Sequence, residues 1–272
     1  MTTLRKDPTS KPNSALLIAA CALLGLLVGS FLNVVIARVP AGESIVSPRS
    51  RCPGCQTEIS PRDNIPVLSW LILRGKCRTC SMSISSRYPI VELLTALVFG
   101  LLAWHFGWSA VLPAFVYLGA IGVALAMIDL DVRRLPNVIV LPSYVVALVL
   151  LGVAAVVDGT PEVMIRAVLG GLALYAFYFL LVLIYPAGMG FGDVKLAGVL
   201  GLYLGFLGWG SVIIGGFLGF ALGGLVGGGL MMARRAGRKS MIPFGPFMLA
   251  GAFLAVFWGE ILAQAYLDQL NL

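Results

Sequence analysis

Long apolar stretches alternate with short polar breaks along most of this chain. Eight such stretches follow a polar tail of residues 1–14, and each is close to the roughly 17 to 25 residues that an α-helix needs to cross a bilayer. They cover residues 15–37, 89–105, 110–130, 137–157, 163–185, 194–209, 211–232 and 243–266. The pattern predicts an all-α polytopic membrane protein with about eight transmembrane helices.

The composition indicates that lipid is the main solvent of the chain. Of its 272 residues, 59% are hydrophobic and 11% are charged, with a mean hydropathy of +0.97. A soluble core of this size cannot bury so much apolar surface. The formal net charge is +7, but the basic residues gather in particular loops, so we expect no nucleic-acid partner.

The positions of the basic residues predict which loops face the cytoplasm. Residues 38–87 hold eight basic and three acidic side chains, Arg133 and Arg134 follow the third apolar stretch, and residues 234–239 hold four more basic side chains. The alternate connections carry almost no positive charge. By the positive-inside rule, the basic connections are cytoplasmic.

The largest of these loops carries two cysteine pairs, each with C-x-x-C spacing. Cys52 and Cys55 form the first pair, and Cys77 and Cys80 form the second, with 21 residues between the pairs. Such turns aim four thiolates at one tetrahedral ion, so the loop is predicted to bind a structural Zn²⁺. A disulfide is disfavoured by a reducing compartment, and a redox site is disfavoured because no βαβ pattern surrounds the cysteines.

Two aspartates lie at the cytoplasmic ends of apolar stretches. Asp129 ends the third stretch, and Asp193 follows Gly190 and Gly192, where the glycines break the apolar pattern before a new helix begins. Both carboxylates are therefore expected at the same depth, where two acids can share one proton. That arrangement is typical of aspartyl proteases.

The residues alone leave simpler interpretations open. Asp193 would serve as a helix cap, and Asp129, Asp131 and Arg133 would form a solvated charge cluster at the membrane surface. Nothing in the pattern chooses between Asp129 and Asp131. Glu92, in the second apolar stretch, is interpreted as the partner of a basic loop residue.

Several segments of the chain resemble the type IV prepilin peptidases, which act as leader peptidases and N-methyltransferases in type IV pilus and type II secretion systems. The matching segments are residues 29–40, both cysteine pairs, residues 63–70, residues 86–93 and the G-x-G-D motif of residues 190–193. In that family the first aspartate stands seven residues before the proline of a Leu-Pro-Asn step, which selects Asp129 over Asp131. The second is Asp193, with Gly190, Gly192 and Lys195 as supporting residues of the active site.

The resemblance implies cleavage of prepilin or pseudopilin leader peptides at the cytoplasmic face of a bacterial inner membrane. S-adenosylmethionine would then methylate the new amino terminus. The only candidate contact for this cofactor is Gly75, just before the second cysteine pair. The implied organisation is a tail over residues 1–14, a first transmembrane helix over 15–38, a zinc-binding loop with the methyltransferase part over 39–88, and an aspartyl peptidase core over 89–272.

Two rival functions follow from the same features. A proton- or cation-coupled transporter, or an assembly scaffold, would use the aspartates as ion ligands and the zinc loop as a docking site. A general intramembrane protease of the presenilin type would also carry a G-x-G-D motif. That class has tyrosine before its first aspartate, whereas Ile128 precedes Asp129 in this chain.

Overall fold

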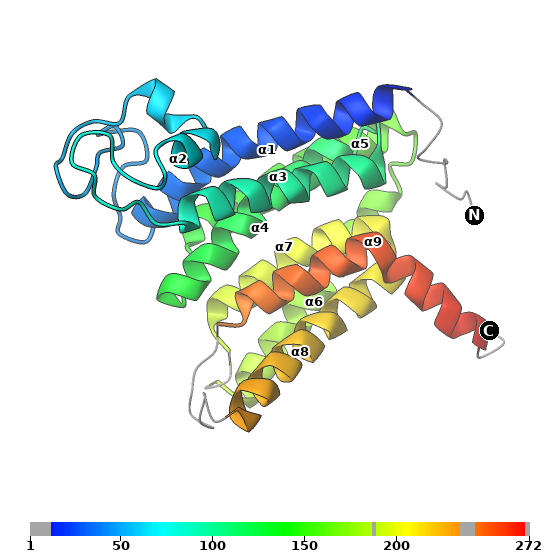
Figure 1. The fold of residues 1–272 in the computed structure, drawn as a ribbon. Helices are drawn as coiled ribbons and strands as arrows, with labels where there is room; N and C mark the ends of the chain where they lie inside the picture. Colours follow the sequence, from blue (N-terminus) through cyan, green and yellow to red (C-terminus); the bar gives the residue numbers. More distant parts are fainter. Residues whose placement is uncertain (1–11, 187–188, 234–242, 270–272) are drawn as a thin grey trace. The chain divides into compact units, whose positions relative to one another are not determined.

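The structure is a computed structural model that describes residues 12–186, 189–233 and 243–269 (Figure 1). Over these ranges the regular elements are helices, and the only β pairing is two isolated bridges. The elements are α1 (Pro12–Arg38), η1 (Pro61–Asn64), α2 (Leu68–Ile72), α3 (Arg87–Phe106), α4 (Leu112–Val132), α5 (Asn137–Val157), α6 (Val163–Ile184), α7 (Phe191–Leu207), α8 (Trp209–Met232) and α9 (Gly245–Gln269). The prediction of an all-α fold is confirmed.

The eight long helices coincide with the eight predicted apolar stretches. Within the described ranges, seven of them are long and apolar enough to cross a membrane, and the remaining one, α7, has 17 residues. The chain is therefore a multi-pass membrane protein. Most of the predicted tail of residues 1–14 and the basic cluster of residues 234–239 lie outside the described residues.

The chain divides into two compact units, Met1–Ala124 and Leu125–Leu272. In the first unit, α1 packs lengthwise against α3 (Figure 1). The two backbones approach closely at Gly25 and Gly29, where a Cβ atom would lie 2.6 Å from the Cα of Ala96 and 2.7 Å from the Cα of Glu92. Small residues allow this kind of contact between helices in a membrane. The loop with both cysteine pairs connects these two helices.

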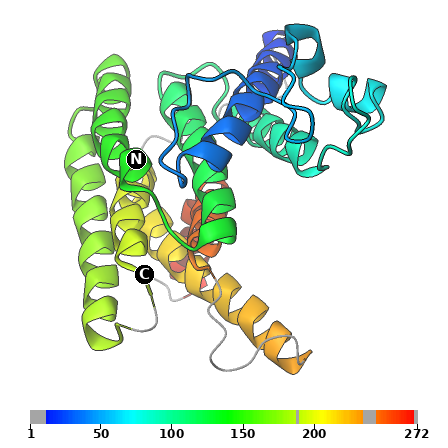
Figure 2. The same cartoon turned by 90° about the vertical axis from the view of Figure 1, so that its left-hand side faces the viewer.

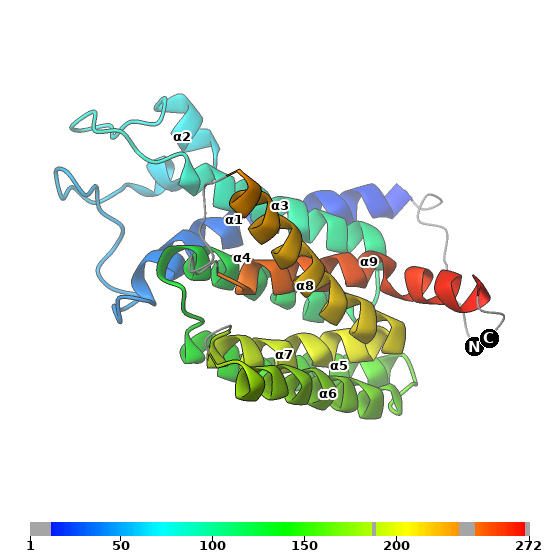
Figure 3. The same cartoon turned by 90° about the horizontal axis from the view of Figure 1, so that it is seen from below.

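The second unit is built around α7, whose side chains are the most enclosed of this unit. From Val194 to Gly205 nearly every residue of α7 is buried, because α5, α6, α8 and α9 all contact it. Figure 3 shows α7 alongside α5 and α6. In Figure 2, α5 is drawn in green and α6 in yellow-green. Gly201 lies against Gly170, where the α6 and α7 backbones touch.

Two charged side chains form hydrogen bonds with the backbone groups that are left unpaired at the break between α7 and α8. Arg166 of α6 donates hydrogen bonds to the carbonyl oxygens of Gly205 (2.7 Å), Phe206 (2.7 Å) and Leu207 (3.2 Å). Glu260 of α9 accepts one from the backbone N–H of Ser211 at 2.8 Å. Charges of these signs suit the C-terminus of one helix and the N-terminus of the next.

Candidate active site

Asp129 lies on the last turn of α4 and is buried, with 4% of its surface exposed. Its Oδ2 atom accepts a hydrogen bond of 3.0 Å from the backbone N–H of Gly245, the first residue of α9. The carboxylate therefore sits at the positive end of a helix dipole. A side chain at Gly245 would place its first carbon 2.8 Å from the same oxygen, so any larger residue would press against the carboxylate.

Asp193 lies in the first turn of α7 and is 8% exposed. Its Oδ2 atom accepts a hydrogen bond of 3.0 Å from the backbone N–H of Gly190, the residue that precedes the helix. This is the return half of a capping box. Asp193 does cap its own helix, as the simpler interpretation expected, but it does so from a buried position.

The two carboxylates converge within the second unit. Their charges interact with each other. The side chain of Leu135 lies against the backbone at Gly192, next to Asp193, and at Gly245, which bonds Asp129. A Cβ atom at Gly192 would be 3.1 Å from the Cβ of Leu135, and one at Gly245 would be 3.4 Å from its Cδ2. Asp131 is exposed, because two residues along a helix turn the side chain by about 200°.

Lys195 contacts α5 and the first residue of its own helix. Its ammonium donates to the side-chain oxygen of Asn137 at 2.9 Å and lies 5.0 Å from the ring centre of Phe191. Its backbone oxygen accepts a hydrogen bond of 2.7 Å from the hydroxyl of Tyr144. These contacts fasten the start of α7, and with it Asp193, to α5.

Sequence reasoning missed Gly245, Leu135 and Tyr178. Tyr178 is 2% exposed, packs on Phe220 with ring centres 5.2 Å apart, and interacts electrostatically with Asp193. The one available signal for Gly245 was its place beside a proline at the start of the last apolar stretch. Tyr178 resembles an ordinary core aromatic in sequence, and no pattern distinguished it.

The four cysteines of the loop gather as predicted. Their sulfur atoms all lie within 4.8 Å of one another, with 3.7 Å between Cys52 and Cys80 and 4.0 Å between Cys55 and Cys77. Tetrahedral Zn–S bonds of about 2.3 Å require sulfur atoms about 3.8 Å apart. The donor set therefore fits a tetrahedral metal ion.

Each cysteine pair occupies the same kind of tight turn. The N–H of Cys52 donates to the Thr57 carbonyl at 3.0 Å, and the N–H of Cys77 donates to the Met82 carbonyl at 2.8 Å. Hydrogen bonds from the hydroxyl and then the backbone of Thr57 lower the pKa of Cys55 to about 6. A thiolate is the form that binds metal.

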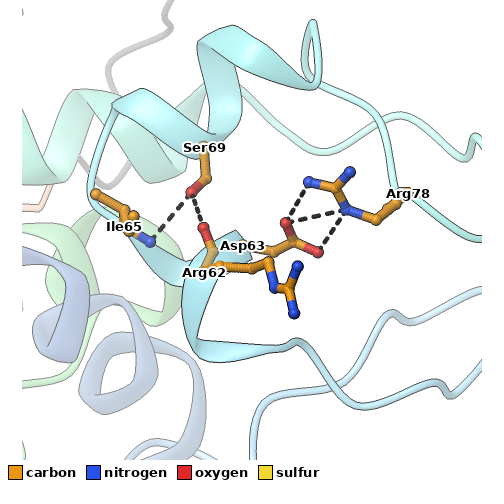
Figure 4. A network of polar contacts seen from close by, with 5 residues as sticks. All are labelled: Arg62, Asp63, Ile65, Ser69 and Arg78. Atoms are coloured by element: carbon orange, nitrogen blue, oxygen red, sulfur yellow. Dashed lines mark hydrogen bonds and ion pairs between the residues drawn. The ribbon is translucent and has the colours of Figure 1, made fainter.

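Polar contacts connect the second cysteine pair to the rest of the loop (Figure 4). The guanidinium of Arg78 donates from Nη2 and Nε to the Asp63 carboxylate, at 2.6 and 2.9 Å. This pairing holds the pKa of Asp63 below its usual range. Ser69 donates to the carbonyl of Arg62 at 2.9 Å and accepts from the N–H of Ile65 at 3.1 Å. The loop is therefore an organised unit around the metal ligands.

Gly75 has a structural role that accounts for its position. It follows α2 with a φ angle of +66°, and a Cβ atom there would lie 2.9 Å from the ring of Trp70. Positive φ angles favour glycine at helix ends. Its neighbour Trp70 is fixed by a hydrogen bond of 3.1 Å from its ring N–H to the Ile84 carbonyl.

The prediction that Glu92 pairs with a basic loop residue was wrong. Its Oε2 atom accepts a hydrogen bond of 2.7 Å from the backbone N–H of Val67, and the hydroxyl of Ser30 also bonds the carboxylate. Within the described residues the two salt bridges of this unit, Arg51–Glu58 and Arg78–Asp63, involve other acids. The loop turn before α2 brings a peptide N–H to the position where a basic side chain was expected.

Comparison with known proteins places both units in one family. Residues 23–106 match the bacterial Peptidase A24 N-terminal domain, and residues 116–228 match the type IV leader peptidase family. The prepilin leader peptidase/N-methyltransferase of Stutzerimonas stutzeri is 37% identical over 94% of this chain and 96% of that protein. The protein of the same name from Pseudomonas aeruginosa is 37% identical over 90% of this chain and 92% of its own length.

The chain belongs to the prepilin leader peptidase/N-methyltransferase family. A relative from Neisseria gonorrhoeae with this name is 41% identical over 69% of the chain and 74% of that protein. No solved structure is significantly similar to the chain.

The family assignment confirms the resemblance and favours a protease over a transporter or a scaffold. The matched leader peptidase region contains Asp129 and Asp193, and the matched N-terminal region contains all four clustered cysteines and Glu92. The aspartate pair and the cysteine cluster therefore lie in different matched regions of one chain.

Proposed function

We propose that this chain removes the leader peptides of type IV prepilins and pseudopilins, with Asp129 and Asp193 as its catalytic pair. The names of its relatives support the substrate class. The observation that carries the residue assignment is that two buried carboxylates lie within electrostatic reach of each other, on backbone segments that both contact Leu135. Each has Oδ2 bonded to a backbone N–H, and Oδ1 of each has no hydrogen-bond partner among the described residues.

Such a pair is suited to peptide hydrolysis. Two close carboxylates share one proton, because both cannot be charged together in a buried site. The ionised acid takes a proton from water, and the resulting hydroxide adds to the scissile carbonyl carbon. The protonated acid donates to the carbonyl oxygen, and a proton then passes to the leaving amine as the C–N bond breaks. The backbone N–H groups of Gly190 and Gly245 hold each acid in place.

The place of cleavage follows from the helix ends that carry the acids. Basic residues Arg133 and Arg134 come directly after α4, so we assign this end of α4 to the cytoplasmic side of the bacterial inner membrane. A substrate with a basic leader and an apolar helix would have its junction at that depth. The reacting peptide bond would therefore meet the carboxylates without either part of the substrate changing solvent.

We assign the cysteine cluster a structural Zn²⁺ and the loop of residues 39–88 a part in methyl transfer, with residues 89–272 as the peptidase core. Four sulfur ligands close the coordination sphere, which suits a structural ion. S-adenosylmethionine, when bound, supplies the methyl group for the new amino terminus. A cavity of about 510 Å³ between the loop, α1 and α3 is within the usual size range of small-molecule sites.

The residue assignment can be tested by incubating the purified protein in detergent with a prepilin and measuring the mass of the product. Asp129→Asn and Asp193→Asn should each lower the rate of leader removal by about 10²- to 10⁴-fold, because acid–base catalysis at that carboxylate is lost. Asp131→Asn is the matched control and should cleave normally. Zinc content and thermal unfolding report on folding. Near-normal cleavage by a folded Asp129→Asn or Asp193→Asn variant would refute its assignment.

A further inference from the structure

Glu92 is a buried acid in the wall of the 510 Å³ cavity of the first unit, far along the chain from the aspartate pair. We propose that its carboxylate binds the free amino terminus of the cleaved pilin and accepts the proton that this amine must lose before it can be methylated. This inference rests on the proposed function and names the residue that receives the methyl acceptor.

The charges around the cavity leave Glu92 as the acid without a basic partner. Three carboxylates line it, those of Glu58, Asp63 and Glu92. Glu58 pairs with Arg51 at 3.2 Å, and Asp63 pairs with Arg78 at 2.6 Å. Among the described residues no ion pair reaches Glu92, although only 7% of its surface is exposed. A carboxylate buried in this way is ionised only beside a counter-charge, and a cationic ligand group provides one.

The two known bonds to Glu92 keep it ready to accept such a group. The Val67 N–H and the Ser30 hydroxyl both donate to the carboxylate, and these bonds hold it in one orientation. Asn33 beside it donates to the carbonyl of Tyr88 at 3.2 Å. The acid is thus fixed in the cavity wall by backbone and hydroxyl groups that cannot neutralise it.

The position of Glu92 favours the substrate amine over the cofactor as the cation. Glu92 lies in the second turn of α3, and its end of the cavity is formed by α1 and α3, which are both candidate membrane spans. The other walls belong to the polar loop. A pilin whose new first residue begins an apolar helix would reach the cavity from the membrane, whereas a water-soluble cofactor would enter from the loop side.

The chemical step requires a base at this position. The amine lone pair attacks the methyl carbon of a sulfonium donor, and the C–S electron pair leaves on sulfur, which becomes a neutral thioether. Only the neutral amine has this lone pair, so the amino terminus must lose a proton before it attacks. The new N–C bond then gives a methylated ammonium ion. An amino terminus has a pKa of about 7.7 to 8.0, so it is mostly protonated at neutral pH. Glu92 takes that proton and passes it to solvent.

A purely structural role for Glu92 makes different predictions. Val67 adopts a φ angle of +60° at the start of α2, and the Glu92 bond to its N–H holds that turn. Glu92→Gln keeps an oxygen that can accept the same hydrogen bond but cannot take a proton or carry charge. A structural role would therefore leave methyl transfer largely intact in Glu92→Gln, or else reduce zinc content and cofactor binding together with it.

The experiment compares wild type, Glu92→Gln, Glu92→Asp and Glu43→Gln, full-length and in detergent. Glu43 is a loop carboxylate outside the cavity. Each protein is incubated with prepilin and radiolabelled S-adenosylmethionine to measure leader cleavage and methyl incorporation. Equilibrium dialysis measures its affinity for the cofactor. Binding of a leader-free pilin peptide is measured with its amino terminus free and acetylated.

In Glu92→Gln we expect leader removal within about twofold of wild type and methylation lowered by about 10²-fold or more. S-adenosylmethionine affinity and zinc content should be unchanged, and the preference for the free over the acetylated peptide should be lost. Glu92→Asp should recover part of the methylation, and Glu43→Gln should match wild type.

Normal methylation by Glu92→Gln would overturn the proposal. So would a loss of cofactor affinity as large as the loss of methylation, since Glu92 would then serve the cofactor or the fold. Wild type that binds free and acetylated peptides equally would also overturn it, even if every variant failed to fold. Wild type that cleaves no prepilin would instead remove the proposed function itself.

Discussion

Replacing Gly245 by alanine should displace the Asp129 carboxylate without unfolding the protein. The backbone N–H of Gly245 bonds Oδ2 of Asp129 at 3.0 Å. The added methyl carbon would lie 2.8 Å from that same oxygen. The atom that must give way is the end of a side chain, which can rotate, whereas the α9 backbone can stay in place.

The size of the effect follows from the overlap. Carbon and oxygen atoms in contact are normally about 3.3 Å apart, so the carboxylate has to move by about 0.5 Å. A misplacement of about 1 Å at a reacting group can cost about 10²-fold in rate. Half that displacement corresponds to about tenfold, or about 1.4 kcal/mol in the activation free energy. One weakened hydrogen bond lowers the unfolding free energy by only about 1 kcal/mol.

The assay is the initial rate of prepilin shortening in detergent, together with thermal unfolding of each variant. Gly152→Ala is the matched control, because a methyl group there would meet no atom within 4 Å. Gly245→Ala should lose about tenfold in rate with a small change in unfolding temperature. Wild-type activity in Gly245→Ala, or an equal loss in Gly152→Ala, would refute the geometry assigned to Asp129.

Three further predictions concern the loop and the helix ends. Cys80→Ser should lower the zinc content measured by mass spectrometry, and full retention of zinc would contradict the four-sulfur site. Arg78 lowers the pKa of Asp63, so their pairing should stabilise the loop fully at pH values above about 3.9, the ordinary pKa of Asp. This stabilisation should be lost as the pH falls through the lower pKa that Asp63 has in the folded protein. Asp63→Asn should remove this acid-dependent part of the loop's thermal stability, and an unchanged pH profile would show that the pairing contributes nothing. Arg166→Ala, which removes three bonds to the end of α7, should lower the unfolding free energy in detergent by about 1.5 to 3 kcal/mol, and a change below about 0.5 kcal/mol would show that solvent replaces these bonds.

The helices of this protein and the local chemistry of its motifs can be read from the order of its residues. Apolar runs predicted the long helices, because a chain in lipid has to satisfy its backbone hydrogen bonds within each helix. The two C-x-x-C pairs predicted a metal cluster, since a turn of this length directs both sulfur atoms to one side. The G-x-G-D motif located the start of α7, where Asp193 bonds the N–H of Gly190 only three residues away.

Which side chains are buried, and what they contact, depends on how the helices and loops pack together. Asp129 and Asp131 look alike in sequence, but helix packing buries the first to 4% exposure and leaves the second exposed. The bond from Gly245 to Asp129 joins residues 116 positions apart, and the bond from Val67 to Glu92 joins residues 25 apart. Contacts of this kind depend on how helices and loop turns pack. A hydrophobic pattern shows which face of a helix is apolar, but it does not identify the residue that this face contacts on another helix.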